Sequence, residues 1–225
     1  MASNEAPIAR ADWLPGALRE WHPGQHVSVV GPTGSGKSRL AIDLLRGSRW
    51  VAAIGTKRTD GTLDTLLRDG YRRVPRWGAV RHRATIRGPR DERVIVWPEW
   101  RAITDDHNPI WEEALNSAWL AGGWTLFLDE LSAISDRQLL RALYTQSRSS
   151  GVSLLAGTQR PRWVPVETWT EATYVAVFRA HHRGDSDAVA DAVGLDRGSI
   201  RLEAYPPFTF AWIDVRTRAV SYVVP

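Results

Sequence analysis

Short apolar runs alternate with amphipathic stretches along most of the chain. The runs are four or five residues long and rich in valine, leucine and isoleucine, which is typical of strands covered on both faces of a sheet. The predicted strands are residues 26–30, 50–54, 94–97, 125–128, 152–156 and 174–178.

The stretches between these runs carry helix signals. Leu40, Leu44 and Leu45 share one face of the stretch that follows the first strand. Asn108 and Pro109 form a typical N-cap and first helical residue. The predicted helices are one that ends near residue 46 and those at residues 63–68, 109–121, 137–148 and 186–193.

The order of these elements predicts the architecture. Strand–helix alternation favours an α/β fold with a mostly parallel central sheet flanked by helices. Residues 208–213 and 219–224 are expected to form an antiparallel hairpin on one sheet edge. The length of 225 residues, without repeats or a linker, predicts a single domain. It would comprise a lead-in at residues 1–23, a core at 24–180 and a C-terminal helix and hairpin at 181–225.

Composition narrows the class of protein. Hydrophobic residues make up 43% of the chain and charged residues 24%, which suits a packed globular protein. Cysteine is absent, which excludes disulfides, thiolate metal sites and cysteine nucleophiles. The longest nearly apolar stretch, residues 119–128, is about half the length that a membrane crossing needs. Because the chain also starts without a signal-peptide pattern, we expect it to lack a membrane segment and to lie in the cytoplasm.

The positive charge is carried almost entirely by arginine. The formal net charge is +4, and all but two of the 29 basic residues are arginines. The two lysines are Lys37 and Lys57. Guanidinium groups suit contacts with phosphate and ion pairs at interfaces, so the bias permits nucleic-acid binding or subunit contacts. Biased codon usage would produce the same composition.

Residues 31–38 read GPTGSGKS and match the phosphate-loop pattern G-x-x-x-x-G-K-[ST] at every fixed position, between a predicted strand and a predicted helix. The glycines let backbone N–H groups face phosphate oxygens, and the helix N-terminus adds positive potential. Lys37 is expected to reach the β and γ phosphates, and Ser38 to bind Mg²⁺. The chain is therefore predicted to be a P-loop NTPase that binds a nucleoside triphosphate and Mg²⁺. The expected nucleotide contacts are Gly31, Pro32, Thr33, Gly34, Ser35, Gly36, Lys37, Ser38 and Arg39.

Two adjacent acids follow the most apolar predicted strand. Asp129 at the end of that strand is placed to hold the magnesium ion, and Glu130 is placed to orient and polarise an attacking water. A carboxylate pair at this position favours hydrolysis over transfer to a small acceptor.

The strand order gives a third candidate. Two predicted strands lie between the phosphate loop and the strand that ends at Asp129, and another buried strand follows Asp129. This arrangement fits the RecA/ASCE-like branch of P-loop ATPases, in which an extra strand separates the loop strand from the carboxylate strand. Gln159 follows that extra strand, and its amide could accept from the attacking water and donate to the γ phosphate.

Three segments together resemble the FtsK-HerA superfamily of DNA-pumping ATPases, especially the short forms that package viral genomes. They are GPTGSGKS at 31–38, TLFLDE at 125–130 and SRSSGVSLLAGTQRP at 147–161. Residues 52–67 are also similar to the family's second strand and following loop, but Gly55 and Thr56 precede Lys57 where the family often has an acid. The resemblance spans about residues 24–180.

The resemblance implies that the nucleotide is ATP, with catalytic roles for Lys37, Glu130 and Gln159 and metal binding by Ser38 and Asp129. It also implies a homo-oligomeric ring, usually a hexamer, in which an arginine of one subunit enters its neighbour's site. The first candidate for this arginine is Arg148, and the alternatives are Arg141 and Arg160.

The most basic stretch of the chain holds seven arginines and no acid. Such a stretch suits contacts with the phosphate backbone of DNA, which ignore sequence, although a solvated or subunit-facing loop explains it equally well. The arginines are Arg72, Arg73, Arg76, Arg81, Arg83, Arg87 and Arg90.

These features favour an ATP-hydrolysing double-stranded DNA translocase of the viral genome-packaging type. Its expected partners are double-stranded DNA, further copies of itself and a capsid portal or vertex protein. The expected location is then the host cytoplasm or the virion. The alternatives are a small-molecule phosphotransferase and an assembly or secretion ATPase of a mobile element.

Overall fold

The computed structural model describes residues 6–80, 84–85, 88–89, 92–99, 108–180 and 182–225. Within these residues a ten-stranded sheet has the order β1-β12-β11-β10-β2-β9-β8-β3-β7-β4, and a separate small hairpin pairs β5 with β6. The strands are β1 (Ile8–Ala9), β2 (Val27–Val30), β3 (Trp50–Ile54), β4 (Arg72–Val74), β5 (Ala84–Thr85), β6 (Gly88–Pro89), β7 (Glu92–Val96), β8 (Thr125–Leu128), β9 (Ser153–Thr158), β10 (Tyr174–Phe178), β11 (Phe210–Asp214) and β12 (Ala219–Val224).

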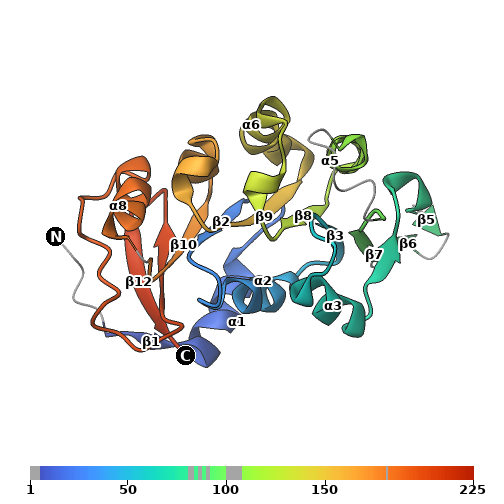
Figure 1. Ribbon diagram of the computed structural model, residues 1–225. Coiled ribbons are helices and arrows are strands. Elements are labelled where there is room, and N and C mark those ends of the chain that lie inside the picture. The colour runs from blue at the N-terminus through green and yellow to red at the C-terminus, as the bar shows by residue number, and fades with distance from the viewer. Residues whose placement is uncertain (1–5, 81–83, 86–87, 90–91, 100–107, 181) are drawn as a thin grey trace.

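Helices cover both faces of the sheet (Figure 1). Helices α1 (Arg10–Glu20), α2 (Lys37–Leu45) and α3 (Gly61–Arg68) lie on one face. The other face carries α5 (Pro109–Ala121), α6 (Arg137–Gln146), α7 (Glu167–Thr170) and α8 (Arg183–Ala192). Short 3-10 turns occur at Trp77–Ala79, Leu131–Ala133, Ser147–Ser150 and Pro161–Trp163. Among the described residues, every helix is too short or too polar to span a bilayer.

The centre of the sheet confirms the predicted α/β architecture. All strands from β10 to β4 in the sheet order run parallel to their neighbours. Strands β2, β8, β9 and β10 are buried along their whole length, as their apolar runs require. Strand β9 lies between β2 and β8, which places the extra strand between the loop strand and the carboxylate strand as predicted. The carboxyl ends of β2, β9 and β8 therefore meet at one edge of the sheet.

The predicted helix signals are also confirmed. The side chain of Asn108 accepts a hydrogen bond from the Ile110 amide and caps α5, with Pro109 in its first turn. Asp136 caps α6 by accepting from the Leu139 amide at 2.9 Å. Helix α6 ends at Gln146, and a 3-10 turn continues to Ser150, so the predicted helix to residue 148 is slightly too long.

The lead-in forms structure that its sequence pattern did not predict. Helix α1 contains Pro15, which removes a backbone donor from the helix interior. Tertiary packing supports the helix instead, because Trp13 is buried against the rings of Phe210 and Trp212, at centroid distances of 5.2 and 4.9 Å. Strands β11 and β12 form the predicted antiparallel hairpin, and β1 pairs alongside β12 as the outermost strand.

His26 is a fully buried side chain between the sheet and α6. Its Nδ1 accepts from the Leu154 amide at 3.1 Å, which leaves Nε2 to donate to the Tyr144 carbonyl oxygen at 3.2 Å. Burial, together with the positive charge of Arg148, lowers the pKa of His26 from 6.5 to about 4. The folded protein therefore holds His26 neutral at pH values where the unfolded chain protonates it.

This lowered pKa predicts that the protein loses stability in mild acid. Stability from His26 is fully present above the unfolded pKa of 6.5 and is lost as the pH falls towards 4, which amounts to about 2 kcal/mol between pH 7 and pH 5. Urea unfolding at the two pH values should show this decrease. It should shrink in His26→Gln and persist in His22→Gln, a control at an exposed histidine. An equal pH dependence in all three proteins would show that His26 is not responsible.

Candidate functional site

The phosphate loop joins β2 to α2 at the carboxyl edge of the sheet. Gly34 and Gly36 have φ values of +79° and +105°, which favour glycine over other residues. At Gly31 a Cβ atom would lie 2.6 Å from Phe178 Cβ, so no larger residue fits there. The loop thus turns tightly and leads directly into the N-terminus of α2 at Lys37, where backbone N–H groups and the helix dipole favour anions.

Lys37 lies folded over this loop. Its Nζ donates to the carbonyl oxygens of Gly31 and Pro32, at 2.6 and 2.9 Å. Burial lowers the pKa of Lys37, while attraction to Asp129 and Glu130 partly opposes the decrease. The ammonium group is therefore held against the loop at the position where phosphate would lie.

Ser38 and Asp129 lie side by side. The Ser38 hydroxyl donates to Asp129 Oδ1 at 3.1 Å, although the two residues belong to α2 and the end of β8. A hydroxyl and a carboxylate are hard oxygen donors, the type that Mg²⁺ prefers. The described residues contain no group of three or more acidic, histidine or cysteine side chains placed to hold a metal. This set therefore fits an ion that takes its remaining ligands from phosphates and water.

Glu130 is fixed by two hydroxyl groups. Ser132 Oγ and Thr158 Oγ1 donate to Glu130 Oε1 at 2.7 and 3.2 Å. Thr158 is the last residue of β9, and the next residue, Gln159, is exposed. These contacts join the end of β8 to the end of β9, so Glu130 and Gln159 face the same space.

That space is a cavity of about 300 Å³. It brings together the predicted catalytic and metal-binding residues except Arg148, along with much of the phosphate loop. Arg39 also reaches the cavity, and its Nε lies 3.6 Å from Asp43 Oδ2. The lining residues are Thr33, Gly34, Gly36, Lys37, Ser38, Arg39, Lys57, Asp129, Glu130, Gln159 and Phe208.

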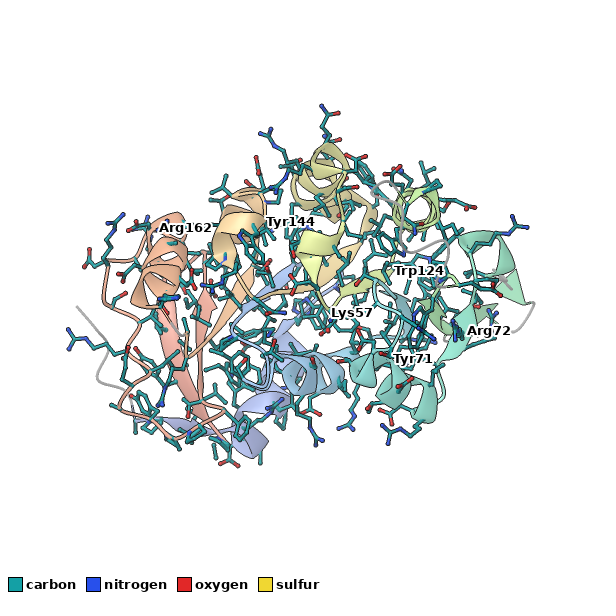
Figure 2. The ribbon with its side chains drawn as sticks, in the orientation of Figure 1. Lys57, Tyr71, Arg72, Trp124, Tyr144 and Arg162 are labelled. Atoms are coloured by element: carbon teal, nitrogen blue, oxygen red, sulfur yellow. The ribbon has the colours of Figure 1, made fainter. Side chains whose placement is uncertain are left out.

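Lys57 is a member of this site to which the sequence pattern assigned no role. Its Nζ lies 3.2 Å from Asp129 Oδ2 and 3.7 Å from Asp60 Oδ2 (Figure 2 shows Lys57 near the middle of the molecule). Burial lowers the pKa of Lys57, but attraction to Asp129 and Asp60 outweighs it, so the pKa is raised overall. One sequence signal was present: Lys37 and Lys57 are the only lysines of the chain, and both line this cavity.

Arg148 lies away from the cavity of its own chain. It precedes the start of β9, whereas Gln159 follows the end of that strand, so the two are at opposite edges of the sheet. Its exposed guanidinium donates to the Glu171 carbonyl oxygen at 3.3 Å and to Thr173 Oγ1 at 3.4 Å. Within the described part of the chain it forms no salt bridge. If Arg148 acts on a phosphate site, that site belongs to another subunit.

The two alternative arginines are engaged within their own chain. Arg141 Nε lies 2.7 Å from Glu167 Oε1, and Arg160 Nη1 lies 3.2 Å from Asp185 Oδ2. Each would have to leave a carboxylate before it could enter a neighbouring site.

The basic stretch is only partly described. Arg72 pairs with Glu92 at 2.6 Å, and Arg73 stacks on the Trp97 ring with Cζ 4.6 Å from its centroid. Both belong to β4, the strand at the far edge of the sheet, and Figure 2 shows Arg72 well away from Lys57. Arg76 is exposed. The remaining arginines of the stretch, Arg81, Arg83, Arg87 and Arg90, lie outside the described residues.

Several solved structures share this fold. The genome packaging NTPase B204 from Sulfolobus turreted icosahedral virus 2, in complex with AMP, matches with a TM-score of 0.66 at 16% identity, over 91% of this chain and 99% of that chain. The pCW3 conjugation coupling protein TcpA with ATPγS matches with a TM-score of 0.54 at 14% identity, over 89% of this chain and 59% of that chain. The cytoplasmic domain of the Thermomonospora curvata type VII secretion ATPase EccC matches with a TM-score of 0.51 at 17% identity, over 89% of this chain and 25% of that chain.

At the level of sequence, no protein-family model matches the chain, and no curated protein matches it significantly. The likeness therefore concerns the three-dimensional arrangement. The chain shares its mostly parallel α/β fold with these packaging, coupling and secretion ATPases.

Proposed function

We propose that this protein is an ATPase that moves double-stranded DNA, of the kind that packages a viral genome. One observation carries the proposal: a lysine and a serine at the start of α2, two acids after β8 and a glutamine after β9 converge on one cavity beside the phosphate loop. These residues are Lys37, Ser38, Asp129, Glu130 and Gln159. The likeness to B204 supports it, because that packaging NTPase matches almost along its whole length and was solved with AMP, ATPγS and AMPPCP.

In this function, the loop amides and Lys37 bind the phosphates of ATP. Ser38 and Asp129 hold Mg²⁺, which neutralises charge on the phosphates when it is bound. Glu130, fixed by its two hydroxyl contacts, orients a water molecule and accepts its proton as the oxygen attacks the γ phosphorus. Gln159, which follows β9, contacts the same water and the γ phosphate. The bond between the γ phosphorus and the oxygen bridging to the β phosphate breaks, and ADP and inorganic phosphate are the products.

The proposed assembly is a homo-oligomeric ring, taken to be a hexamer, that encircles DNA and docks on a capsid portal or vertex protein. The exposed Arg148 supports subunit contacts at the sheet edge opposite the cavity, since it is a cation without a carboxylate partner in the described residues. The protein would act in the host cytoplasm or on the virion.

The likeness to TcpA and EccC favours a second candidate, an assembly or secretion ATPase of a mobile element. The site chemistry would be the same, and the difference would lie in what the ring moves.

We expect linear duplex DNA to stimulate ATP hydrolysis by this protein, because a DNA translocase couples the hydrolysis of ATP to movement along DNA. The stimulation should weaken between roughly 50 and roughly 200 mM salt, since contacts with DNA phosphates release counterions. The measurement is the ATPase rate with and without DNA at both salt concentrations, with the mass in solution recorded for the same samples.

Lys37→Ala is the control and should remove both basal and stimulated turnover. DNA-indifferent turnover by a ring would favour the secretion-type candidate. Slow, DNA-indifferent turnover by a monomer would favour a small-molecule phosphotransferase, and either result would reject the DNA translocase.

A further inference from the structure

Phe208 adds little to the stability of the fold and has a strained backbone conformation. Its side chain is 58% exposed, so the ring gains little from burial. Its backbone has φ +68°, in the left-handed region that non-glycine residues rarely adopt. Stability of the fold therefore does not explain a phenylalanine at this position.

The ring borders the phosphate loop. Phe208 lines the same cavity as Lys37 and Asp129, and a Cβ atom placed on Gly36 would lie 3.5 Å from Phe208 Cδ1. The ring therefore borders the space next to the start of α2, where the proposed nucleotide binds.

The surrounding chain holds Phe208 in this place. Arg179, just after β10, donates hydrogen bonds to the carbonyl oxygens of Leu202, Glu203 and Tyr205. These bonds fix the loop that precedes Phe208. Residues 206–207 are both prolines, which restrict the backbone further. After Phe208 the chain enters β11, whose first residue, Phe210, packs against the ring of Phe178 at a centroid distance of 5.1 Å. These contacts hold the backbone at Phe208 beside the phosphate loop without a ligand.

The sheet order tells which part of a nucleotide meets this ring. Asp129 and Glu130 follow β8, two strands to one side of the loop strand β2. Phe208 precedes β11, two strands to the other side. Since the γ phosphate has to lie on the side of the two acids, the other end of the nucleotide, its base, extends towards Phe208.

We propose that Phe208 is the base-stacking residue of this site: its ring packs on the base of the bound nucleoside triphosphate. The inference rests on the nucleotide-binding function proposed above and adds the subsite that recognises the base. Stacking uses the flat face that every base has, so Phe208 contributes affinity for both adenine and guanine nucleotides and does not choose between them.

The test compares ligands with and without a base. Binding of AMPPCP, GMPPCP and inorganic tripolyphosphate is measured by calorimetry in the presence of Mg²⁺, with the wild type, Phe208→Ala and Phe208→Trp. Phe208→Ala should weaken both nucleotide analogues roughly tenfold, within the range measured for base–aromatic stacking, and leave tripolyphosphate unchanged. Phe208→Trp should retain nucleotide affinity.

Trp163→Ala is the matched control, because Trp163 is also 58% exposed but lies outside the cavity, and this variant should bind all three ligands as the wild type does. Phe208→Gly should unfold at no lower urea concentration than the wild type, since glycine accepts the positive φ, which separates stacking from folding. Equal losses for all three ligands in Phe208→Ala, or no loss for the analogues, would overturn the stacking role. If the wild type binds tripolyphosphate no better than Lys37→Ala does, the cavity beside the phosphate loop is not a nucleotide site. That result would contradict both the proposed ATPase function and the stacking role of Phe208.

Discussion

Replacement of Glu130 by glutamine is expected to remove most ATP hydrolysis and to leave nucleotide binding intact. Glutamine keeps the shape of the side chain and one oxygen that can accept the hydrogen bonds from Ser132 and Thr158. It cannot take a proton from water, and loss of a general base typically costs about 10² to 10⁴ in rate. Single-turnover ATP hydrolysis and AMPPCP binding, measured on the same preparation, separate the two effects.

Glu113→Gln is a suitable control, because it makes the same chemical change at an exposed position of α5. Unchanged turnover in Glu130→Gln would eliminate Glu130 as the base. A parallel loss of binding would instead point to a structural role for its contacts with Ser132 and β9.

The second large effect is expected for Arg148→Ala. If Arg148 enters the site of the neighbouring subunit, its loss should reduce turnover by about 10³ to 10⁵, the range for an arginine that neutralises transition-state charge. Among the residues that the structure describes, its guanidinium donates to two neutral oxygen atoms, at 3.3 and 3.4 Å, and forms no salt bridge, so few contacts have to be broken for it to move. Turnover of the assembled protein with DNA is the quantity to measure.

Mixing experiments distinguish action between subunits from action within one. Arg148→Ala has an intact phosphate site, and Lys37→Ala has an intact arginine, so mixed rings should recover part of the activity that each variant lacks alone. Arg141→Ala, which removes an arginine already paired with Glu167, should retain activity. Failure of the mixture to recover, in rings shown to contain both variants, would rule out Arg148 as the arginine that acts in trans.

Sequence reasoning succeeded where a local signal determines structure. The phosphate loop, the caps at Asn108 and Asp136, and the apolar runs of β8 and β9 each specify their own conformation. The order of β2, β9 and β8, and with it the meeting of Asp129 and Gln159 at one edge, is inferred from the fit of these elements to the RecA/ASCE-like branch of P-loop ATPases and not from a local pattern.

The rest depends on contacts between distant parts of the chain. Lys57 joins the site only because β3 pairs with β8, which brings its ammonium group to Asp129. Helix α1 contains a proline and is held by Trp13 packing on β11, which no local pattern reveals. Phe208 has no sequence signal beyond the prolines that precede it, since its φ value and its exposure are visible only in the folded chain.

The pairing of β1 with β12 affects how the protein can fold during synthesis. Figure 1 shows these strands side by side, although nearly the whole chain separates them in sequence. A ribosome releases the chain from its N-terminus, and contacts between distant segments form slowly. Strands β3, β8 and β9 could therefore pair before β11 and β12 have been synthesised. Until then, β1 and the buried face of α1 lack the strands against which they pack. The half of the sheet that carries Asp129 and Glu130 would then assemble first. The other edge, formed by β11, β12 and β1 next to Phe208, would assemble last.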